Sequence, residues 1–500
     1  MRVVQNLQMQ IGEVDISQIK FDPKSRDDIP KILKGLQHLY MNLPLREQIF
    51  KLLEAEISPG VSKLNGRPGM ALWKIFVCGV VRLDLNENYD RLHDLVNHHD
   101  TIREMLGHSE YDGAYYQYQT LVDNVSLFTP ELLDKINQVV VSGGHTLVKK
   151  KEGEALRGRC DSFVVETDVH YPTDINLLGD AMRKVITLTA QWCDEREISD
   201  WRQHAYNLRH IKRLMRSAQN KKRSKAKSEA QKKKNETLVV KAHQEYLDVA
   251  ERYLEKARDT IAMLEQQGFT NESDVLKKLE IEGFMQHARR QIDQTKRRVM
   301  LGEVIPHDEK VFSIFEPHTE WVSKGKAGVP VELGVKVCIL EDGHQFVLHH
   351  QVMEKKTDDQ VAVQMVADTK KRFPDLNACS FDKGFHSPDN QVSLKEKLEH
   401  VVLPKKGKLS QQAREAEQTE PFIKARYAHS AVESAINALE VHGLDMCPDH
   451  GIDGFKRYVA FAVVARNIHR IGDILWKQEQ LREQRKKKYS GRAPPYKLAA

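Results

Sequence analysis

Three acidic residues in separate segments of the chain could together bind divalent metal ions. Asp161 lies within a short run of apolar and β-branched residues, Asp382 follows another such run, and Glu433 lies one position from the apolar stripe of an expected helix. Adjacent strands of a sheet are about 4.8 Å apart, so two strand aspartates can share a metal ion. Two cations held by carboxylates supply an activated water and stabilise the leaving oxygen in phosphodiester chemistry. The three acids therefore predict a two-metal phosphoryl-transfer site.

Each acid has a plainer explanation when it is considered alone. An aspartate after a strand is usually a turn former or a helix cap, and a glutamate on a helix is usually a solvated surface residue. Glu166, Asp168 and Asp174 also compete with Asp161 near the same strand. Side chains alternate along a strand, so Glu166 and Asp168 are expected on the opposite face from Asp161. Asp174 is better explained as a helix cap, and only the joint order of the elements favours the metal site.

The elements that must position these acids form a mixed α/β pattern. Apolar periodicity and turn residues predict strands at 161–165, 331–340, 345–353, 378–381 and 400–403, and helices at 358–373, 387–398 and 429–442. This order predicts a mixed sheet with helices packed on it. The polar, lysine-containing segment 405–417 is expected to be a mobile loop.

Residues 175–301 interrupt this pattern with a long stretch almost free of strand signals. Apolar residues from Leu247 to Leu264 step by three and four, as in a coiled-coil seam, and the pattern resumes after Gly268. We expect a helical hairpin inserted after the first strand, which splits a catalytic domain of residues 150–480. Without the insertion, Asp161 and Asp382 come within the range of one active site.

The remaining segments predict an amino-terminal helical domain and two flanking extensions. Residues 61–145 suit short helices joined by tight turns, as in a DNA reader of the helix-turn-helix type, or a helical bundle with no ligand. Residues 1–60 form an amino-terminal extension, and residues 481–500 are expected to be a flexible basic tail.

The composition fits a cytoplasmic protein and not a secreted or membrane protein. Of the 500 residues, 30% are charged and 40% are hydrophobic, and the mean hydropathy is −0.55. The 6 cysteines lack paired spacing, which indicates neither a disulfide framework nor a cysteine zinc site. The longest apolar run is too short to cross a bilayer, and the first residues lack the apolar core of a secretory signal.

Local clusters of basic residues predict contacts with a phosphate backbone, although the net charge is only +6. The densest cluster lies on the helical insertion, and a second follows the strand expected at 400–403. Their members are Lys221, Lys222, Arg223 and Lys225 in the first, and Lys405 and Lys406 in the second. The alternative for the first cluster is a solvated or disordered charged stretch.

Several strings of the sequence resemble DDE-type insertion-sequence transposases, most closely the ISNCY group of bacterial elements. The three acidic motifs are carried by residues 161–174, by Phe381-Asp-Lys-Gly-Phe385 and by His429-Ser-Ala-Val-Glu-Ser-Ala-Ile-Asn437. Further similar strings are Gly66-Arg-Pro68, Glu316-Pro-His-Thr-Glu-Trp321, Lys324-Gly-Lys326 and Val463-Val-Ala-Arg-Asn467. The resemblance covers about residues 60–475.

The resemblance implies a ribonuclease-H-like catalytic core with Asp161, Asp382 and Glu433 as its metal ligands. Two Mg²⁺ or Mn²⁺ ions are the implied cofactors, and the implied substrates are double-stranded transposon ends and target DNA. Hydrolysis would free a 3′-hydroxyl that then attacks the target, and paired ends imply a homodimer or a larger assembly. The amino-terminal similarity implies that Arg67 contacts DNA.

Two departures from the family pattern concern Phe163 and Glu440. Phe163 stands where many relatives have threonine, and this change affects packing more than chemistry. Many relatives place a lysine or arginine about two turns after the glutamate, where this chain has Glu440. Arg426, two turns before Glu433, is the candidate for part of the missing DNA contact.

Two alternatives to a transposase stay open at the level of sequence. One is a stand-alone metal-dependent nuclease that cuts but does not join DNA. The other is a non-catalytic DNA-binding protein derived from a transposase. A phosphate-cradling glycine loop is absent from the sequence, so nucleotide hydrolysis is not expected.

Overall fold

The structure is a computed structural model that describes most of the chain and divides it into two compact units. The described residues are 2–6, 12–22, 24–56, 69–109, 112–149, 154–223, 228–269, 271–323, 330–408 and 410–490. The fold is a mixed α/β fold and is mostly helical, at 65%. The sheet unit comprises Met1–Asp168 and Val322–Ala500, and the helical unit comprises Val169–Trp321. Within the described ranges, no helix is both long and apolar enough to cross a membrane.

One mixed sheet organises the sheet unit around its long central strand, β1 (Leu156–Thr167). β3 (Val331–Asp342) pairs antiparallel with β1 on one side, and β5 (Leu376–Phe381) pairs parallel with it on the other. β4 (Val347–Val352) pairs antiparallel with β3, and β6 (His400–Val402) pairs parallel with β5. Short strands β2 (Glu320–Ser323) and β7 (Met446–Cys447) complete the order β2-β3-β1-β5-β6, in which β4 joins β3 and β7 joins β1.

The predicted strands are all present, whereas two shorter features differ from the prediction. β2 and β7 have too few residues to show a periodic pattern, and the sequence did not predict them. The segment 405–417, predicted as a loop, contains a helix, α14 (Gln411–Glu417). Its glutamine, alanine and glutamate residues are good helix formers, which the polar character of the segment obscured.

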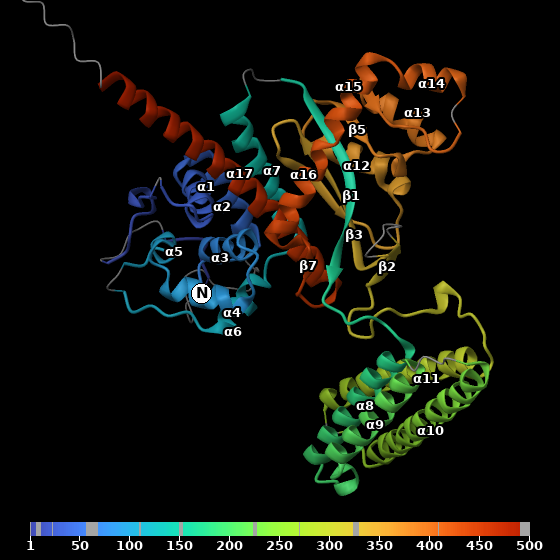
Figure 1. The fold of residues 1–500 in the computed structure, drawn as a ribbon. Helices are drawn as coiled ribbons and strands as arrows, with labels where there is room; N and C mark the ends of the chain where they lie inside the picture. The colour runs from blue at the N-terminus through green and yellow to red at the C-terminus, as the bar shows by residue number, and fades with distance from the viewer. Residues whose placement is uncertain are drawn as a thin grey trace, which may run out of the picture. The chain divides into compact units, whose positions relative to one another are not determined.

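Helices cover the sheet from both faces (Figure 1). α12 (Asp358–Arg372) contacts β3 and β4, and α13 (Pro388–Lys397) packs beside α12. The helix predicted at 429–442 is three elements: α15 (Glu420–His429), α16 (Ala431–Leu439) and a π-helical turn, η5 (Glu440–Leu444). α17 (Gly451–Ser490) contacts β4, and it continues through the first ten residues of the predicted tail at 481–500.

The amino-terminal helices pack against α17 and share one hydrophobic core with the sheet. They are η1 (Ile16–Gln18), α1 (Ile29–Met41), α2 (Leu43–Ala55), α3 (Leu72–Asp84), α4 (Tyr89–His98), α5 (Asp100–Met105), α6 (Tyr118–Val125) and α7 (Pro130–Val148). α1, α3 and α7 all contact α17. The segments predicted as separate domains, 61–145 and most of 150–480, therefore share the sheet unit, and the division of the chain falls at 168/169 and 321/322.

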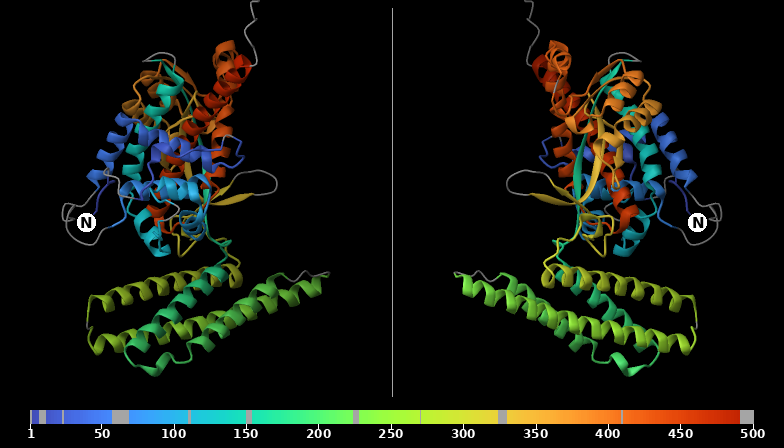
Figure 2. Two further views of the ribbon diagram at one scale, coloured as in Figure 1. Left: turned by 90° about the vertical axis from the view of Figure 1, so that its left-hand side faces the viewer. Right: turned by 90° about the vertical axis from the view of Figure 1, so that its right-hand side faces the viewer.

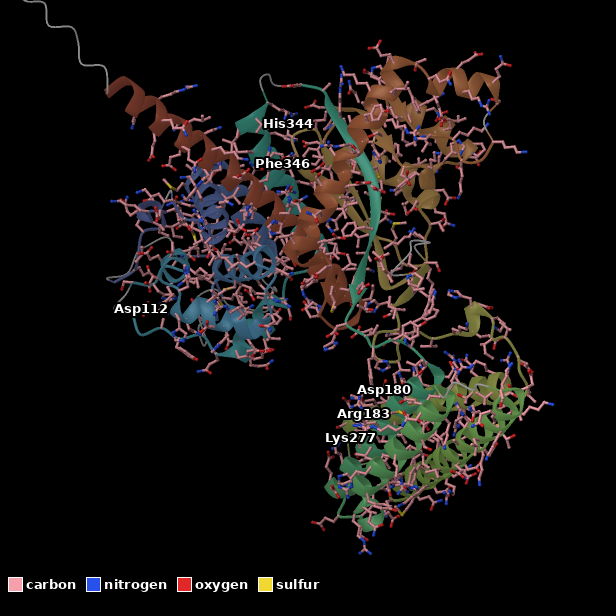
Figure 3. The ribbon with its side chains drawn as sticks, viewed as in Figure 1. Asp112, Asp180, Arg183, Lys277, His344 and Phe346 are labelled. Carbon is pink, nitrogen blue, oxygen red and sulfur yellow. The ribbon has the colours of Figure 1, made fainter. Side chains whose placement is uncertain are left out.

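Glycines allow the closest approaches between these helices. A Cβ on Gly472 of α17 would lie 1.9 Å from the main-chain oxygen of Lys31 in α1, which no real contact permits. A Cβ on Gly144 of α7 would lie 2.3 Å from the ring of Phe346. Phe346 and His344 extend from the turn between β3 and β4, and both rings contact His145 of α7 (Figure 3). Small residues thus bring α7 against the sheet and α1 against α17.

The helical unit is built from four helices around its own core, where the sequence predicted a hairpin. These helices are α8 (Asp174–Glu195), α9 (His204–Arg223), α10 (Glu229–Gln266) and α11 (Glu272–Met300), with short 3-10 turns η2 (Ser199–Trp201) and η3 (His307–Glu309). α8 contacts each of the other three, and Figure 2 shows the long helices alongside one another. Thr173, and not Asp174, caps α8, because its hydroxyl accepts a hydrogen bond from the amide of Asn176.

Candidate carboxylate site

The register of β1 and β5 places Asp161 and Asp382 at the same level of the sheet. Cys160 of β1 pairs with Phe381 of β5 in parallel alignment, and both side chains are buried. An aspartate follows each of these two residues, Asp161 after Cys160 and Asp382 after Phe381. Because parallel neighbours advance together, Asp161 and Asp382 emerge beside each other where β5 ends. The buried pair thus fixes the position of the acidic pair.

Glu433 approaches the same strand from the first turn of α16. Val432 and Ala435 of this helix are buried, and α16 contacts β1. Glu433 is exposed, so the helix packs through its apolar side and leaves this carboxylate at the edge of the packed face. α16 therefore packs on the sheet and also carries the Glu433 carboxylate.

The carboxylates act on one another electrostatically, most strongly at Asp161. Burial, with the charges of Asp382, Asp358 and Glu433, raises the pKa of Asp161 to about 6, against the lowering effect of a hydrogen bond from the amide of Ser162. That amide lies 2.8 Å from Asp161 Oδ1 and fixes the orientation of the carboxylate. A half-buried acid among like charges is a group that a bound cation would stabilise.

The oxygens of the three acids are not gathered as tightly as another group of potential ligands. Among the described residues, Asp84, His442 and His469 form the group whose ligand atoms all lie within 4.8 Å of one another. Like charges repel, which accounts for a wider spacing of three carboxylates. The acids therefore define an electronegative site whose oxygens are more widely spaced than the ligand atoms of the Asp84 group.

Asp358 is a fourth carboxylate at this site that the sequence did not predict. It accepts a hydrogen bond of 2.6 Å from Ser162 Oγ and an ion pair of 3.2 Å from Lys336 Nζ. A Cβ on Gly384, two residues after Asp382, would lie 2.9 Å from Asp358 Oδ2. In the sequence Asp358 looks like an ordinary acid in the first turn of a capped helix, so no pattern distinguished it.

His429 is a second unpredicted residue beside the acids. Its Nδ1 lies 2.9 Å from Ser380 Oγ on β5, and its buried Nε2 has no hydrogen-bond partner among the described residues. Burial lowers its pKa, an effect that the nearby carboxylates of Asp382 and Glu433 oppose. Its position four residues before Glu433 was the available signal.

The competing acids on β1 lie away from this site. Glu166 pairs with Gly334 and Met446, and its amide donates to the carbonyl of Asp445. Glu166 lies five positions along the strand from Asp161, a distance of about 16 Å. The pairing of the strands therefore separates Asp161 from Glu166. The alternation of side chains along the strand could only suggest this separation.

The predicted basic residues fall into three groups. Arg67 and Lys225 lie outside the described residues, as does the side chain of Arg223 at the end of α9. Lys221 and Lys222 are exposed on the last turn of α9 in the helical unit. Lys405 and Lys406 follow β6, and exposed Arg426 lies on α15, which contacts β5 and β6. Strands β5 and β6 are parallel, so the last group lies toward the sheet edge that carries Asp382.

Comparison with known proteins returns nothing that assigns the chain to a family. No protein-family model, no curated protein and no solved structure matches it. The functional argument therefore rests on the residues of this chain and on their arrangement.

Proposed function

We propose that this protein is a metal-dependent DNA transposase that cleaves transposon ends and joins the freed 3′-hydroxyl to target DNA. The observation that carries the proposal is the meeting of Asp382, Glu433 and Asp161 from three distant segments at one electronegative site. The alignment of the acidic pair at the end of β5 is compatible with a shared metal ion. The motif resemblance supplies the reaction, and the geometry supports the choice of residues.

The strand arrangement supports a ribonuclease-H-like core. Three strands in chain order, β1, β3 and β4, form an antiparallel meander, and β5 and β6 then add in parallel on the other side of β1. The central strand carries the first acid, its parallel neighbour ends at the second, and a later helix presents the third. The helical unit enters the chain between β1 and β3 and leaves this order intact.

The donor set at the site fits Mg²⁺ or Mn²⁺. Asp161, Asp382 and Glu433 offer only carboxylate oxygens, which are the hard ligands that these ions prefer. When bound, such ions supply an activated water and charge stabilisation of the leaving oxygen. Two further residues of the protein support the site. The amide of Ser162 orients the Asp161 carboxylate, and Lys336 balances the charge of Asp358.

Basic groups at the same sheet edge would hold the DNA strand at the acids. Lys405, Lys406 and Arg426 lie on segments that adjoin β5 and β6. Each phosphate contact adds affinity and a salt dependence of about one counterion. We expect the triple change of these residues to alanine to weaken DNA binding about tenfold or more and to flatten the salt dependence, as measured by fluorescence anisotropy at several salt concentrations.

A stand-alone nuclease and a non-catalytic DNA-binding protein are the competing functions. Incubation of the purified protein with Mg²⁺, DNA carrying the repeats that flank its gene, and a target plasmid separates the three. Joined products support the transposase, cleavage alone supports the nuclease, and binding without cleavage supports the third. Asp168→Asn is a suitable control, because this exposed acid follows the same strand away from the site.

A further inference from the structure

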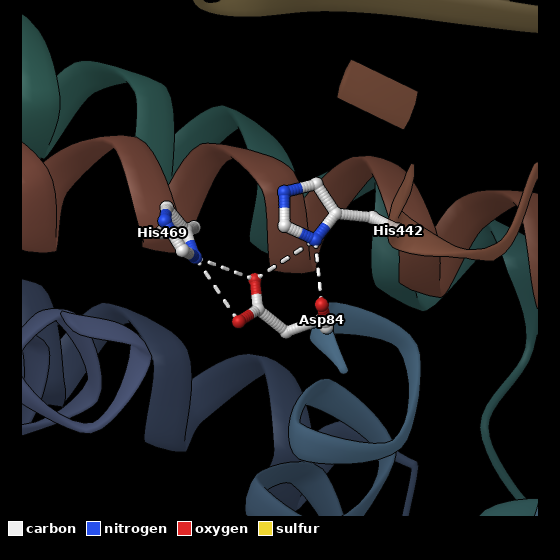
Figure 4. Close-up of side chains that lie close together, drawn as sticks. All are labelled: Asp84, His442 and His469. Carbon is white, nitrogen blue, oxygen red and sulfur yellow. Dashed lines mark hydrogen bonds and ion pairs between the residues drawn. The ribbon is translucent and has the colours of Figure 1, made fainter. Parts of the chain in front are cut away.

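Asp84, His442 and His469 form a compact cluster that shares no residue with the three acidic motifs. Figure 4 shows both imidazoles turned toward the Asp84 carboxylate. His469 Nδ1 lies 3.0 Å from each carboxylate oxygen, and His442 Nδ1 lies 3.4 Å from Oδ1. His442 Nδ1 also lies 2.6 Å from the main-chain oxygen of Asp84. Two nitrogens and several oxygens thus face a common point.

The three residues reach this point from three separate elements of the sheet unit. Asp84 is the last residue of α3, where the helix presents its free carbonyls and the negative end of its dipole. His442 lies in the π-helical turn η5, followed by Gly443 at φ 94°, and His469 lies on α17. The irregular turn positions His442, and the end of a helix adds a main-chain oxygen to the side-chain donors.

The charges around the cluster also favour a cation. The Asp84 carboxylate is fully buried, and a buried charge is costly unless it is paired or binds a metal. Asp28, the residue before α1, interacts electrostatically with both histidines, and its carboxylate is also paired with Lys31 at 2.7 Å. Arg466 opposes a cation, but its charge is shared with the buried Glu341. Contacts from His442 and His469 and the charge of Arg466 offset the Asp84 carboxylate. A bound metal ion would have to replace the two histidine contacts.

We propose that Asp84, His442 and His469 bind one divalent transition-metal ion, with Zn²⁺ as the best fit. Two imidazole nitrogens with a carboxylate are borderline ligands that Zn²⁺ prefers over Mg²⁺ or Ca²⁺. The ion would connect α3, η5 and α17. Because η5 directly follows α16, it would also hold the end of the helix that carries Glu433. The proposal does not depend on the proposed transposase activity.

Sequence spacing gave no sign of this site, because Asp84 lies 358 positions before His442 and the two histidines are not at a ligand spacing. The six cysteines are buried and free, and their scattered spacing directed attention away from zinc. Only packing of α3 against α17 and η5 brings the donors together.

Metal analysis of the full-length protein tests the proposal directly. The Asp161→Asn, Asp382→Asn, Glu433→Gln variant serves as the background, so that the other carboxylate site does not contribute. After removal of metal with a chelator, the protein is incubated with Zn²⁺, desalted and measured by elemental mass spectrometry and thermal unfolding. We expect about one retained zinc per chain and a higher melting temperature, because binding to the folded state alone stabilises it.

Two variants and a matched control decide the assignment. His469→Asn and Asp84→Asn should each lose the retained zinc and the shift in melting temperature. His98→Asn, an exposed histidine of the same unit, should keep both. Equal zinc retention in His469→Asn, or no retained zinc in the background protein, would overturn the proposal. If the variants fail to fold, the Co²⁺ spectrum of the background protein decides: nitrogen and oxygen ligation is expected, and a thiolate charge-transfer band contradicts it.

Discussion

The sheet unit and the helical unit differ in how they place polar groups in their interiors. In the sheet unit, buried polar residues from distant segments pair with one another. His145 lies 2.6 Å from Asp342, and Asn467 donates to Asn137 at 2.7 Å. Arg82 pairs with Asp449 at 2.7 Å while its side chain is almost fully buried. Such pairs are costly to break, because each partner would be left buried and alone.

In the helical unit, ion pairs lie mostly at the surface over an apolar seam. Lys296 pairs with Glu251 at 2.6 Å, and Arg297 pairs with Glu309 at 2.5 Å. Exposed pairs of this kind contribute little to stability. Buried polar pairs occur here too, since Asp274 accepts a hydrogen bond of 3.0 Å from Trp192, and Thr260 accepts one of 3.0 Å from Trp201. The comparison teaches that specific polar geometry, and with it the candidate chemistry, is concentrated in the sheet unit.

The largest effect is expected where helices of the sheet unit meet at a glycine. In Gly472→Ala, the new methyl group would overlap the main-chain oxygen of Lys31, which cannot move without shifting α1. We expect a loss of about 3 kcal/mol in the free energy of unfolding, measured by chemical denaturation. An unchanged unfolding midpoint would show that the contact between α1 and α17 is not close-packed.

The next largest effect concerns the electrostatic cost of the carboxylate site. Asp161 has a pKa of about 6 in the folded protein, against an ordinary value of 3.8 for an aspartate, so the folded protein binds one more proton than the unfolded chain between these pH values. Stability conferred by protonated Asp161 is therefore lost as the pH rises through this window, and the full cost is present above pH 6.

Asp161→Asn removes this cost and tests its size. The variant should be more stable than the wild type by about 2 kcal/mol at pH 7.5 without divalent ions, and by little near pH 4. Thermal unfolding at both values measures the difference, and Mg²⁺ should stabilise the wild type more than the variant. Equal stability of the two proteins across the whole range would contradict an unfavourable charge on Asp161.

A smaller effect, opposite in sign to that of Gly472→Ala, is expected in the helical unit. Gly283 lies inside α11, and a Cβ there meets nothing within 4 Å. Gly283→Ala should therefore stabilise the unit by about 0.5–1 kcal/mol through helix propensity and a less flexible unfolded chain. Denaturation of this variant alongside Gly472→Ala compares the two units with the same chemical change.

The smallest effect is expected for a surface ion pair of the helical unit. Lys296→Ala removes the partner of Glu251, and both side chains are about two-fifths exposed, at 39% and 41%. We expect a change below about 0.5 kcal/mol in the free energy of unfolding. A loss above about 2 kcal/mol would contradict the expectation that exposed ion pairs of this unit contribute little to its stability.

The sequence predicted those parts of the fold that local patterns determine. Alternating apolar runs identified β1 and β3, and seam periodicity identified α10 and α11. Short elements were not predicted, because a strand such as β7, with only two residues, shows no periodic pattern. The extent of the shared core also escaped, because it depends on the packing of α17 against α1, α3 and α7.

The sequence proposed the three acids of the candidate site, Asp161, Asp382 and Glu433, but not the residues around them. Asp382 and Glu433 lie in recognisable strand-end and helix contexts, and register favours Asp161 over Glu166. Asp358 and His429 contribute through contacts between distant segments, with Ser162 and Ser380 respectively. Such contacts leave no spacing in the sequence, because three-dimensional packing alone creates them.

The central claim is that Asp161, Asp382 and Glu433 form the metal-binding centre of a DNA-joining enzyme. The most direct test is a Mg²⁺-dependent cleavage and strand-transfer assay on the repeats that flank the gene, with wild-type protein, Asp382→Asn and the Asp168→Asn control. We predict that Asp382→Asn binds the DNA normally but loses cleavage and joining by at least about a thousandfold, or about 4 kcal/mol, whereas the control retains both. Mg²⁺-dependent cleavage by Asp382→Asn at the wild-type rate would contradict the account.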